Sequence, residues 1–351
     1  MPAYESVYGS LMRLGFMASP FLERGGSKLA RGLRGRRAAT ERLVGWAGEG
    51  RRPGQGLVWF HAPSVGEGLQ ARVVLAALAE RAAVEGRPLE TVFTHFSPSA
   101  EALAASMPVD VAAYLPWDVP SAVGPVLDAL HPDLVVFTKT EVWPVMSREA
   151  RRRGIPTALV AATLPEGSSR LRWPTREVLR PSVRRLASVL AIGEEDAARF
   201  RRLGAHDERV YVTGDPAIDS AVQRAGQANP DATYLRPFRE YGREHGRPTV
   251  VAGSTWPADE AVLLPACARV RAFVEDVRLI VAPHEPTGSH VAALERRLAL
   301  DGWRVGRLGD VEAAGTAEDV DAVVVDRVGV LAHLYTVADV AYVGGGFHGA
   351  G

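Results

Sequence analysis

Hydrophobic residues occur in short runs that alternate with longer amphipathic stretches over most of the chain. In the first half, the apolar runs of strand length are residues 57–61, 89–94, 111–114, 134–137, 155–161 and 189–192. Between them, apolar positions recur at helical spacing in residues 67–85, 100–106, 119–130 and 170–186. Alternating strands and helices are typical of a parallel sheet with helices on both faces. The pattern therefore predicts one Rossmann-like domain.

The alternation begins again after an apolar run at 210–213 and a stretch at 215–248 that is rich in polar residues, glycine and proline. Further strands are predicted at 249–252, 278–282, 303–307, 323–325 and 340–343, and helices at 258–274, 290–301 and 330–335. The fold class is therefore α/β, with two doubly wound parallel-sheet domains. Because ligands of such sheets bind outside the carboxyl ends of the strands, we expect the site in a cleft between the domains.

The N-terminal region has a pattern of its own, and we treat residues 1–50 as a basic amphipathic segment ahead of domains at 51–215 and 216–351. Its apolar residues lie near helical spacing: Val7, Leu11, Leu14, Met17, Phe21 and Leu22. A basic stretch at 24–42 follows, and residues 1–52 carry ten basic against four acidic residues, a local charge of +6. The segment is either an interfacial helix whose basic strip meets anionic lipid headgroups, or a helix packed on its own domain with a solvated basic face.

Composition narrows the class of protein. With 47% hydrophobic and 23% charged residues, the chain is neither disordered nor a disulfide scaffold. Its net charge of zero gives no indication of nucleic-acid binding, and a single cysteine, Cys267, favours a reducing, cytoplasmic setting. The longest run without charge, 54–66, is shorter than the roughly 18–20 residues of a transmembrane helix.

The first predicted strand is followed by a candidate catalytic acid. Its continuation, His61-Ala62-Pro63-Ser64-Val65-Gly66-Glu67, is not the glycine fingerprint of a dinucleotide-binding dehydrogenase. Gly66 permits close approach of a backbone, and Glu67 lies where the following helix begins. A carboxylate at this place either acts as a general base toward a bound hydroxyl or complements the helix dipole.

A second acid follows the strand at 134–137, in the sequence Thr138-Lys139-Thr140-Glu141-Val142-Trp143-Pro144. Lys139 is one of two lysines in a chain with 39 arginines. This scarcity indicates that position 139 needs a compact ammonium group rather than a guanidinium. Alternatively, Lys139 and Glu141 form a pair that braces the loop.

Three strand ends in the second half carry small or polar residues. Gly253-Ser254-Thr255 lies between a predicted strand and a predicted helix, where exposed backbone N–H groups form a candidate phosphate cradle. His284 and Glu285 follow the next strand, and Gly344-Gly345-Gly346 follows the last. The glycine run indicates either backbone close to a ligand or a tight packing turn.

Six motifs occur in a fixed order along the chain. They are S-V-G-E (64–67), T-x-T-E-V-W-P (138–144), V-T-G-D (212–215), A-G-S-T (252–255), A-P-H-E (282–285) and L-Y-x-x-A-D-V-A-Y-V-G-G-G (334–346). From about residue 57 to the last residue, this set resembles the 3-deoxy-D-manno-octulosonic acid (Kdo) transferases of lipid A biosynthesis.

The resemblance implies a GT-B architecture and metal-independent, inverting transfer of Kdo from CMP-Kdo to a lipid A precursor of the lipid IVA type, without a cofactor. It places the enzyme peripherally on the cytoplasmic face of the inner membrane. Glu67 matches the family's proposed base, and Glu141 its second important acid. We place Ser64, Gly66, Lys139 and Arg170 on the acceptor side, the last two by position only. The expected donor contacts are Gly253, Ser254, Thr255, His284, Glu285, Gly344, Gly345 and Gly346.

The chain departs from the family pattern at three places. Several members carry glutamate where this chain has Lys139, so a role of that acid does not transfer. The segment Pro283-His284-Glu285-Pro286 lacks the arginine of the related family motif. The sequence stops at Gly351, before a further histidine- and glutamate-bearing segment of the family, so we expect a truncated protein that binds CMP weakly or not at all.

Two other classes of protein stay open. One is a different GT-B sugar-nucleotide enzyme, such as a lipid A disaccharide synthase or a UDP-sugar epimerase. The other is a non-catalytic, truncated lipid-associated protein.

Overall fold

The computed structural model describes residues 3–52, 54–226, 232–239, 247–274 and 276–347. The chain divides into two compact units, Met1–Ser220 and Ala221–Gly351. Each is built on a parallel sheet, which confirms the predicted α/β class. The division falls inside helix α9 (Pro216–Gly226), whereas the sequence pattern places it after Asp215.

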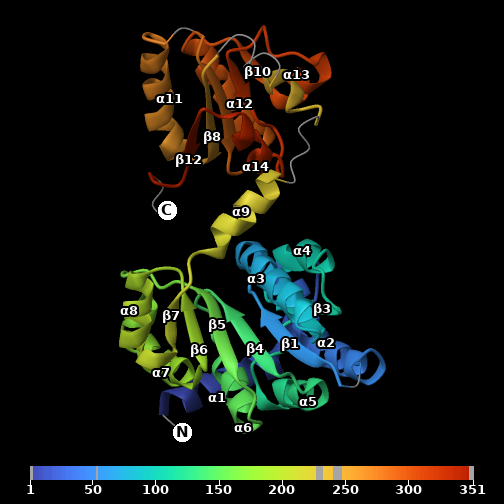
Figure 1. The fold of residues 1–351 in the computed structure, drawn as a ribbon. Helices are drawn as coiled ribbons and strands as arrows, with labels where there is room; N and C mark the ends of the chain where they lie inside the picture. The colour runs from blue at the N-terminus through green and yellow to red at the C-terminus, as the bar shows by residue number, and fades with distance from the viewer. Residues whose placement is uncertain (1–2, 53, 227–231, 240–246, 275, 348–351) are drawn as a thin grey trace. The chain divides into compact units, whose positions relative to one another are not determined.

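Seven parallel strands form the sheet of the first unit, in the order β3-β2-β1-β4-β5-β6-β7 (Figure 1). They are β1 (Gly56–His61), β2 (Leu89–His95), β3 (Val111–Tyr114), β4 (Leu134–Thr138), β5 (Thr157–Ala162), β6 (Ser188–Ala191) and β7 (Val210–Val212). The chain order runs outward from β1 in one direction and from β4 in the other. Ligands of doubly wound sheets bind at such a switch point, which here lies between β1 and β4.

Helices cover both faces of this sheet. They are α1 (Ala3–Leu22), α2 (Lys28–Glu49), α3 (Val65–Val84), α4 (Glu101–Ala105), α5 (Pro120–Leu130), α6 (Pro144–Arg152), α7 (Thr175–Arg185) and α8 (Glu194–Leu203). Side chains of α2, α5, α6, α7 and α8 share one core with the strands, and those of α3 and α4 share the other. Residues 1–50 therefore belong to this unit, because α2 contributes Leu43 to its main core.

The second unit has five parallel strands in the order β10-β11-β9-β8-β12. They are β8 (Thr249–Thr255), β9 (Arg278–Pro283), β10 (Val305–Arg307), β11 (Ala322–Val324) and β12 (Val340–Val343). Helices α11 (Pro257–Arg271) and α12 (Gly288–Leu300) cover one face, and α13 (Leu308–Ala314) and α14 (Leu331–Leu334) cover the other (Figure 1).

All eleven predicted strands are present, and the apolar run at 210–213 contains a further one, β7, but the helices differ from the prediction in several places. The segment expected to be a linker contains α9, and α6, α8 and α13 have no predicted counterpart. Helix α7 begins at Thr175 rather than near residue 170, because Pro174 disfavours helical backbone in the residue before it.

Candidate active site

The ends of two neighbouring strands bring Glu67 and Lys139 together. Strands β1 and β4 pair in parallel, with His61 beside Phe137, so the residues that follow them leave the sheet at the same edge. The Lys139 ammonium lies 3.8 Å from Glu67 Oε1, and the Ser64 hydroxyl donates a hydrogen bond to Glu67 Oε2. The Glu67 side chain is 18% exposed, so it is held by two partners and still reaches solvent.

Gly66 lies in the first turn of α3, directly before this acid. A Cβ atom at Gly66 would meet nothing within 4 Å, so no other segment packs against this position. We call the group of Ser64, Glu67 and Lys139 the Glu67 cluster.

Lys139 has a backbone conformation that is rare for a residue with a side chain. Its φ of +63° lies in the left-handed region, and its N–H donates to the Val160 carbonyl of β5 at 2.9 Å. Non-glycine residues adopt this region at some cost, often at functional sites. The expectation that Lys139 braces Glu141 is wrong, because Lys139 instead pairs with Glu67.

Glu141 belongs to a second ion pair. Arg170 donates to Glu141 Oε1 at 2.7 Å, and each side chain is about one-third exposed. The four predicted charged residues of the first unit thus form two pairs, Glu67–Lys139 and Glu141–Arg170.

Asp118 is a buried acid that the sequence analysis missed, and it holds the start of the helix that follows Glu141. Asp118 is buried and accepts hydrogen bonds from the backbone N–H groups of Val145 (3.0 Å) and Met146 (2.7 Å), in the first turn of α6. The hydroxyl of Tyr8 in α1 also donates to it at 2.9 Å. Burial raises the pKa of Asp118, although these donors oppose the shift.

Arg36 lies beside this acid in a box of aromatic rings. Its guanidinium is 4.5 Å from the ring centre of Trp117, 4.6 Å from that of Phe96 and 5.5 Å from that of Trp143. Burial lowers the pKa of Arg36 to about 10. Its place on the buried face of α2 is the sequence signal that could have found it, since the other buried positions on that face are Ala30, Gly32, Ala39 and Leu43.

The basic stretch at 24–42 is therefore not a continuous solvated strip, because Arg36 is buried.

Helix α1 has two different faces. Its inner face contributes Glu5, which forms two hydrogen bonds with Arg185 of α7 (2.6 and 2.7 Å). Its outer face leaves a stripe of apolar side chains more than half exposed: Val7, Leu11, Leu14, Met17, Phe21 and Leu22. Among the described residues, no helix is long and apolar enough to cross a membrane.

In the second unit, three strand ends meet through backbone hydrogen bonds. The N–H of Gly344 donates to the Gly253 carbonyl at 2.8 Å, and that of His284 donates to the Thr255 carbonyl at 2.9 Å. A Cβ atom at Gly344 would lie 2.4 Å from the Ser254 carbonyl oxygen, so only glycine permits this approach. The predicted donor residues at the end of β8 and after β9 and β12 are thus neighbours.

The predicted turn at Gly253-Ser254-Thr255 is wrong in its local structure. These residues are the end of β8, with an irregular register and a φ of +52° at Ser254, and α11 begins only at Pro257. Proline has no N–H to offer an anion, so the first turn of α11 is a poorer phosphate cradle than the pattern indicates. The exposed imidazole of His284 stacks on Trp256, with ring centres 4.5 Å apart.

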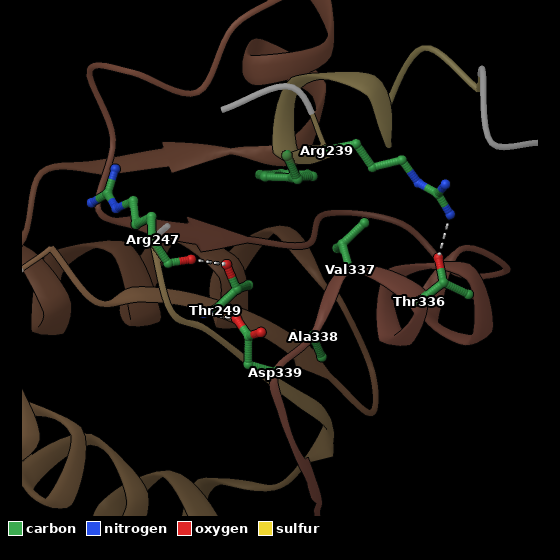
Figure 2. A pocket seen from close by; sticks show the side chains of 8 residues that line it. Arg239, Arg247, Thr249, Thr336, Val337, Ala338 and Asp339 are labelled. Carbon is green, nitrogen blue, oxygen red and sulfur yellow. Dashed lines mark hydrogen bonds between the residues drawn. The ribbon is translucent and has the colours of Figure 1, made fainter. Parts of the chain in front are cut away.

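A cavity of about 200 Å³ in the same unit lies at the opposite end of the strands (Figure 2). Its lining includes Thr249, the first residue of β8, and Asp339, which precedes β12. It is therefore separate from the loops at the carboxyl ends. Across the residues that the structure describes, no group of three or more potential metal ligands is present.

Comparisons with known proteins agree with the order of motifs. A family model described as 3-Deoxy-D-manno-octulosonic-acid transferase (kdotransferase) matches residues 35–220. The chain is 30% identical over 301 residues to the 3-deoxy-D-manno-octulosonic acid transferase of Bordetella pertussis, covering 83% of this chain and 66% of the relative. It is also 30% identical over 304 residues to that of Chlamydophila psittaci, covering 84% and 65%. The chain thus spans slightly less than two thirds of the length of these relatives.

Solved structures of similar fold include UDP-GlcNAc 2-epimerase from Neisseria meningitidis, with a TM-score of 0.55 and 13% identity over 83% of this chain and 78% of that one. A second is a putative UDP-N-acetylglucosamine 2-epimerase from Listeria monocytogenes, with a TM-score of 0.57 and 14% identity over 83% and 75%. At this identity the likeness concerns the fold alone.

Proposed function

Because this chain belongs to the 3-deoxy-D-manno-octulosonic acid transferase family, we propose that it takes part in inverting, metal-independent transfer of Kdo from CMP-Kdo to a hydroxyl of a lipid A precursor. The observation that carries the proposal is the Glu67 cluster. It combines an accessible carboxylate, a hydroxyl that orients it and an ammonium at the switch point of the sheet.

In the proposed reaction, Glu67 acts as the general base. It takes the proton of the acceptor hydroxyl as that oxygen forms a bond to the anomeric carbon of Kdo, while the bond from that carbon to the CMP phosphate breaks on the opposite face. Ser64 holds Oε2 of Glu67, and Lys139 lies beside Oε1. Proton transfer to a base positioned in this way contributes roughly 10²–10⁴-fold to a rate.

The remaining charged groups provide for the anionic parts of the substrates. Arg170 and Lys139 are the cations beside the two acids, and we assign them to the Kdo carboxylate or to a phosphate of the acceptor. The donor nucleotide is assigned to the end of β8 and the loops after β9 and β12, which backbone hydrogen bonds hold side by side.

The outer face of α1 supports association with the cytoplasmic face of the inner membrane. Its exposed apolar stripe is the face that an interfacial helix buries among lipid headgroups, and the nearby exposed arginines suit an anionic surface. The enzyme would then reach a lipid acceptor that stays in the membrane.

Transfer of Kdo from CMP-Kdo to lipid IVA, measured with the full-length gene product, tests the proposal. We expect Glu67→Gln to lower the rate by about 100-fold or more, because the amide cannot take the proton. Glu80→Gln is the matched control, since Glu80 lies exposed on the same helix α3. Equal rates for wild type and Glu67→Gln would remove the base assignment, and epimerisation of UDP-GlcNAc in place of Kdo transfer would favour the alternative sugar-nucleotide enzyme.

A further inference from the structure

Two adjacent carboxylates at the start of α11, Asp259 and Glu260, are buried. Their residues are 0% and 8% exposed, in the first helical turn after β8. Acidic residues are almost never buried unless they are paired, so their partners indicate why they are there. These partners lie on different loops.

Asp259 is directed to the loop after β12. Its Oδ2 accepts hydrogen bonds from the N–H of Gly345 at 2.8 Å and from that of Trp256 at 2.9 Å. Its Oδ1 accepts from the N–H of Phe347 and from the Tyr342 hydroxyl, both at 3.2 Å. Burial by itself raises the pKa of Asp259, but the backbone donors outweigh it and hold this pKa below its usual value. Asp259 is thus an anionic acceptor that fixes the glycine loop.

Glu260 is directed to the end of β8 and to α12, and it reaches the loop after β9 through His290. Its Oε1 accepts from the Thr255 hydroxyl at 2.9 Å, and its two oxygens lie 3.0 and 3.1 Å from Nε2 of His290 in α12. Nδ1 of His290 lies 3.3 Å from the backbone carbonyl of Glu285. The two ring nitrogens of His290 thus lie within hydrogen-bond distance of two different groups, Glu260 on one side and the Glu285 carbonyl on the other. His290 therefore links Glu260 to the loop that carries His284 and Glu285.

We propose that Asp259 and Glu260 are positioning residues that assemble the donor side of the site, each fixing a different loop against the end of β8. We call the two acids with their partners the clamp, and the contacts of each acid one arm of it. The assignment of these loops to a nucleotide rests on the proposed function, whereas the clamp itself does not. A run of three glycines loses much conformational freedom when it is ordered, so it needs such an anchor to present its backbone to a ligand.

Helix capping alone does not explain the pair. Asp259 accepts from the Trp256 N–H, as a residue at the third helical position of a capping box does. Its contacts with Gly345 and Phe347, and all contacts of Glu260 with Thr255 and His290, lie outside the helix.

Hydrogen exchange of the full-length gene product, read by mass spectrometry, separates the two arms of the clamp. We expect Asp259→Asn to speed exchange about tenfold or more in peptides covering 341–347, and to leave peptides covering 284–291 within about twofold, because a charge-assisted acceptor is lost in one loop only. Glu260→Gln should give the reverse. Asp310→Asn, an exposed acid in the first turn of α13, is the control and should change neither loop. Variants that loosen both loops equally, or neither, would overturn the proposal.

Two measurements on the wild-type protein decide the question even where a variant does not fold. NMR should show nuclear Overhauser effects between the His290 ring and the Glu260 side chain, and a carboxyl titration should show Asp259 with a midpoint below the usual value of about 3.9. Absence of contacts between His290 and Glu260 overturns the Glu260 arm, and a midpoint at or above the usual value overturns the Asp259 arm.

Calorimetry with CMP then tests what the clamp is for. If the wild type binds CMP, both variants should raise the dissociation constant about tenfold or more while Asp310→Asn does not. Unchanged CMP binding in variants with loosened loops would overturn the positioning role. No CMP binding by the wild type would instead count against the proposed function, and the exchange data would still judge the clamp.

Discussion

The two units place acids at the same kind of position, after a parallel strand, and use them in opposite ways. In the first unit, the Glu67 and Glu141 side chains are 18% and 32% exposed, and each faces one flexible cation. In the second unit, Asp259 and Glu260 are buried, and their oxygens accept from backbone and side-chain donors of their own fold. An acid with accessible oxygen can take a proton from another molecule, whereas one whose lone pairs are filled can only hold the chain. The burial of an acid and the partners of its oxygens, rather than its position after a strand, thus distinguish an acid that can react from one that stabilises the fold.

Asp118 shows that the first unit contains both kinds of acid. Like Asp259, it is buried and accepts N–H groups at the start of a helix that follows a functional loop. Its third partner, Tyr8, comes from α1, whose outer face carries the apolar stripe. The proposed membrane helix is therefore connected to the helix that follows Glu141 through one buried carboxylate.

The largest effect on folding should come from the buried acid. We expect Asp118→Ala to lower the free energy of unfolding by about 3 kcal/mol, because two backbone N–H groups and the Tyr8 hydroxyl lose their acceptor. Glu141→Gln, which alters an exposed ion pair, should change it by less than about 1 kcal/mol. Urea denaturation followed by circular dichroism gives both values, and equal losses would contradict the distinction between the two kinds of acid.

Sequence reasoning reached the strands and the exposed acids for a physical reason. Strands buried on both faces are continuous apolar runs, so β1 and β4 stand out, and Glu67 and Glu141 lie a few residues beyond their ends. Helices α6 and α8 have only nine and ten residues, several of them arginine, so each offers few apolar positions from which a helical period can be recognised. The sequence could not predict the ion pairs. Lys139 contacts Glu67 because β1 and β4 are neighbours in the sheet, and the strand order is not visible in the sequence. Burial of Asp118 and Asp259 likewise depends on contacts between distant segments.

The two faces of α1 give the next prediction. Leu14 lies on the outer face and is 64% exposed. We expect Leu14→Glu to weaken binding to vesicles of phosphatidylcholine and phosphatidylglycerol (3:1) about thirtyfold. This corresponds to about 2 kcal/mol, the value of one buried leucine side chain. Leu300→Glu is the control, since Leu300 is an exposed leucine of α12. A similar loss for both variants in a sedimentation assay would show that the α1 stripe is not the lipid surface.

A histidine in each unit extends the comparison to pH. His61 of β1 is fully buried, and burial lowers its pKa to about 3, whereas His290 lies against a carboxylate. Between pH 6.5 and 3 the unfolded chain binds a proton at residue 61 that the folded protein does not, so stability falls as the pH falls. His61→Phe should make this dependence shallower by about 1.4 kcal/mol per pH unit.

Unfolding curves from pH 7 to pH 4 measure that slope. His206→Gln serves as the control, because 40% of the His206 side chain is exposed to solvent. A slope in His61→Phe equal to that of the wild type would mean that His61 takes up its proton without unfolding.

The smallest effect on stability should come from Lys139, where the first unit keeps a strained backbone beside its accessible acid. Glycine relieves a φ of +63°, and an exposed ion pair at 3.8 Å contributes at most about 1 kcal/mol, so Lys139→Gly should leave stability unchanged or raise it by up to about 1 kcal/mol. Lys139→Met keeps the strain and removes only the charge, so it should be no more stable than the wild type. If both variants lose Kdo transfer while only the glycine variant gains stability, the strained lysine is retained for the reaction rather than for the fold. A glycine variant that is less stable than the methionine variant would instead show that the left-handed backbone at residue 139 carries no strain.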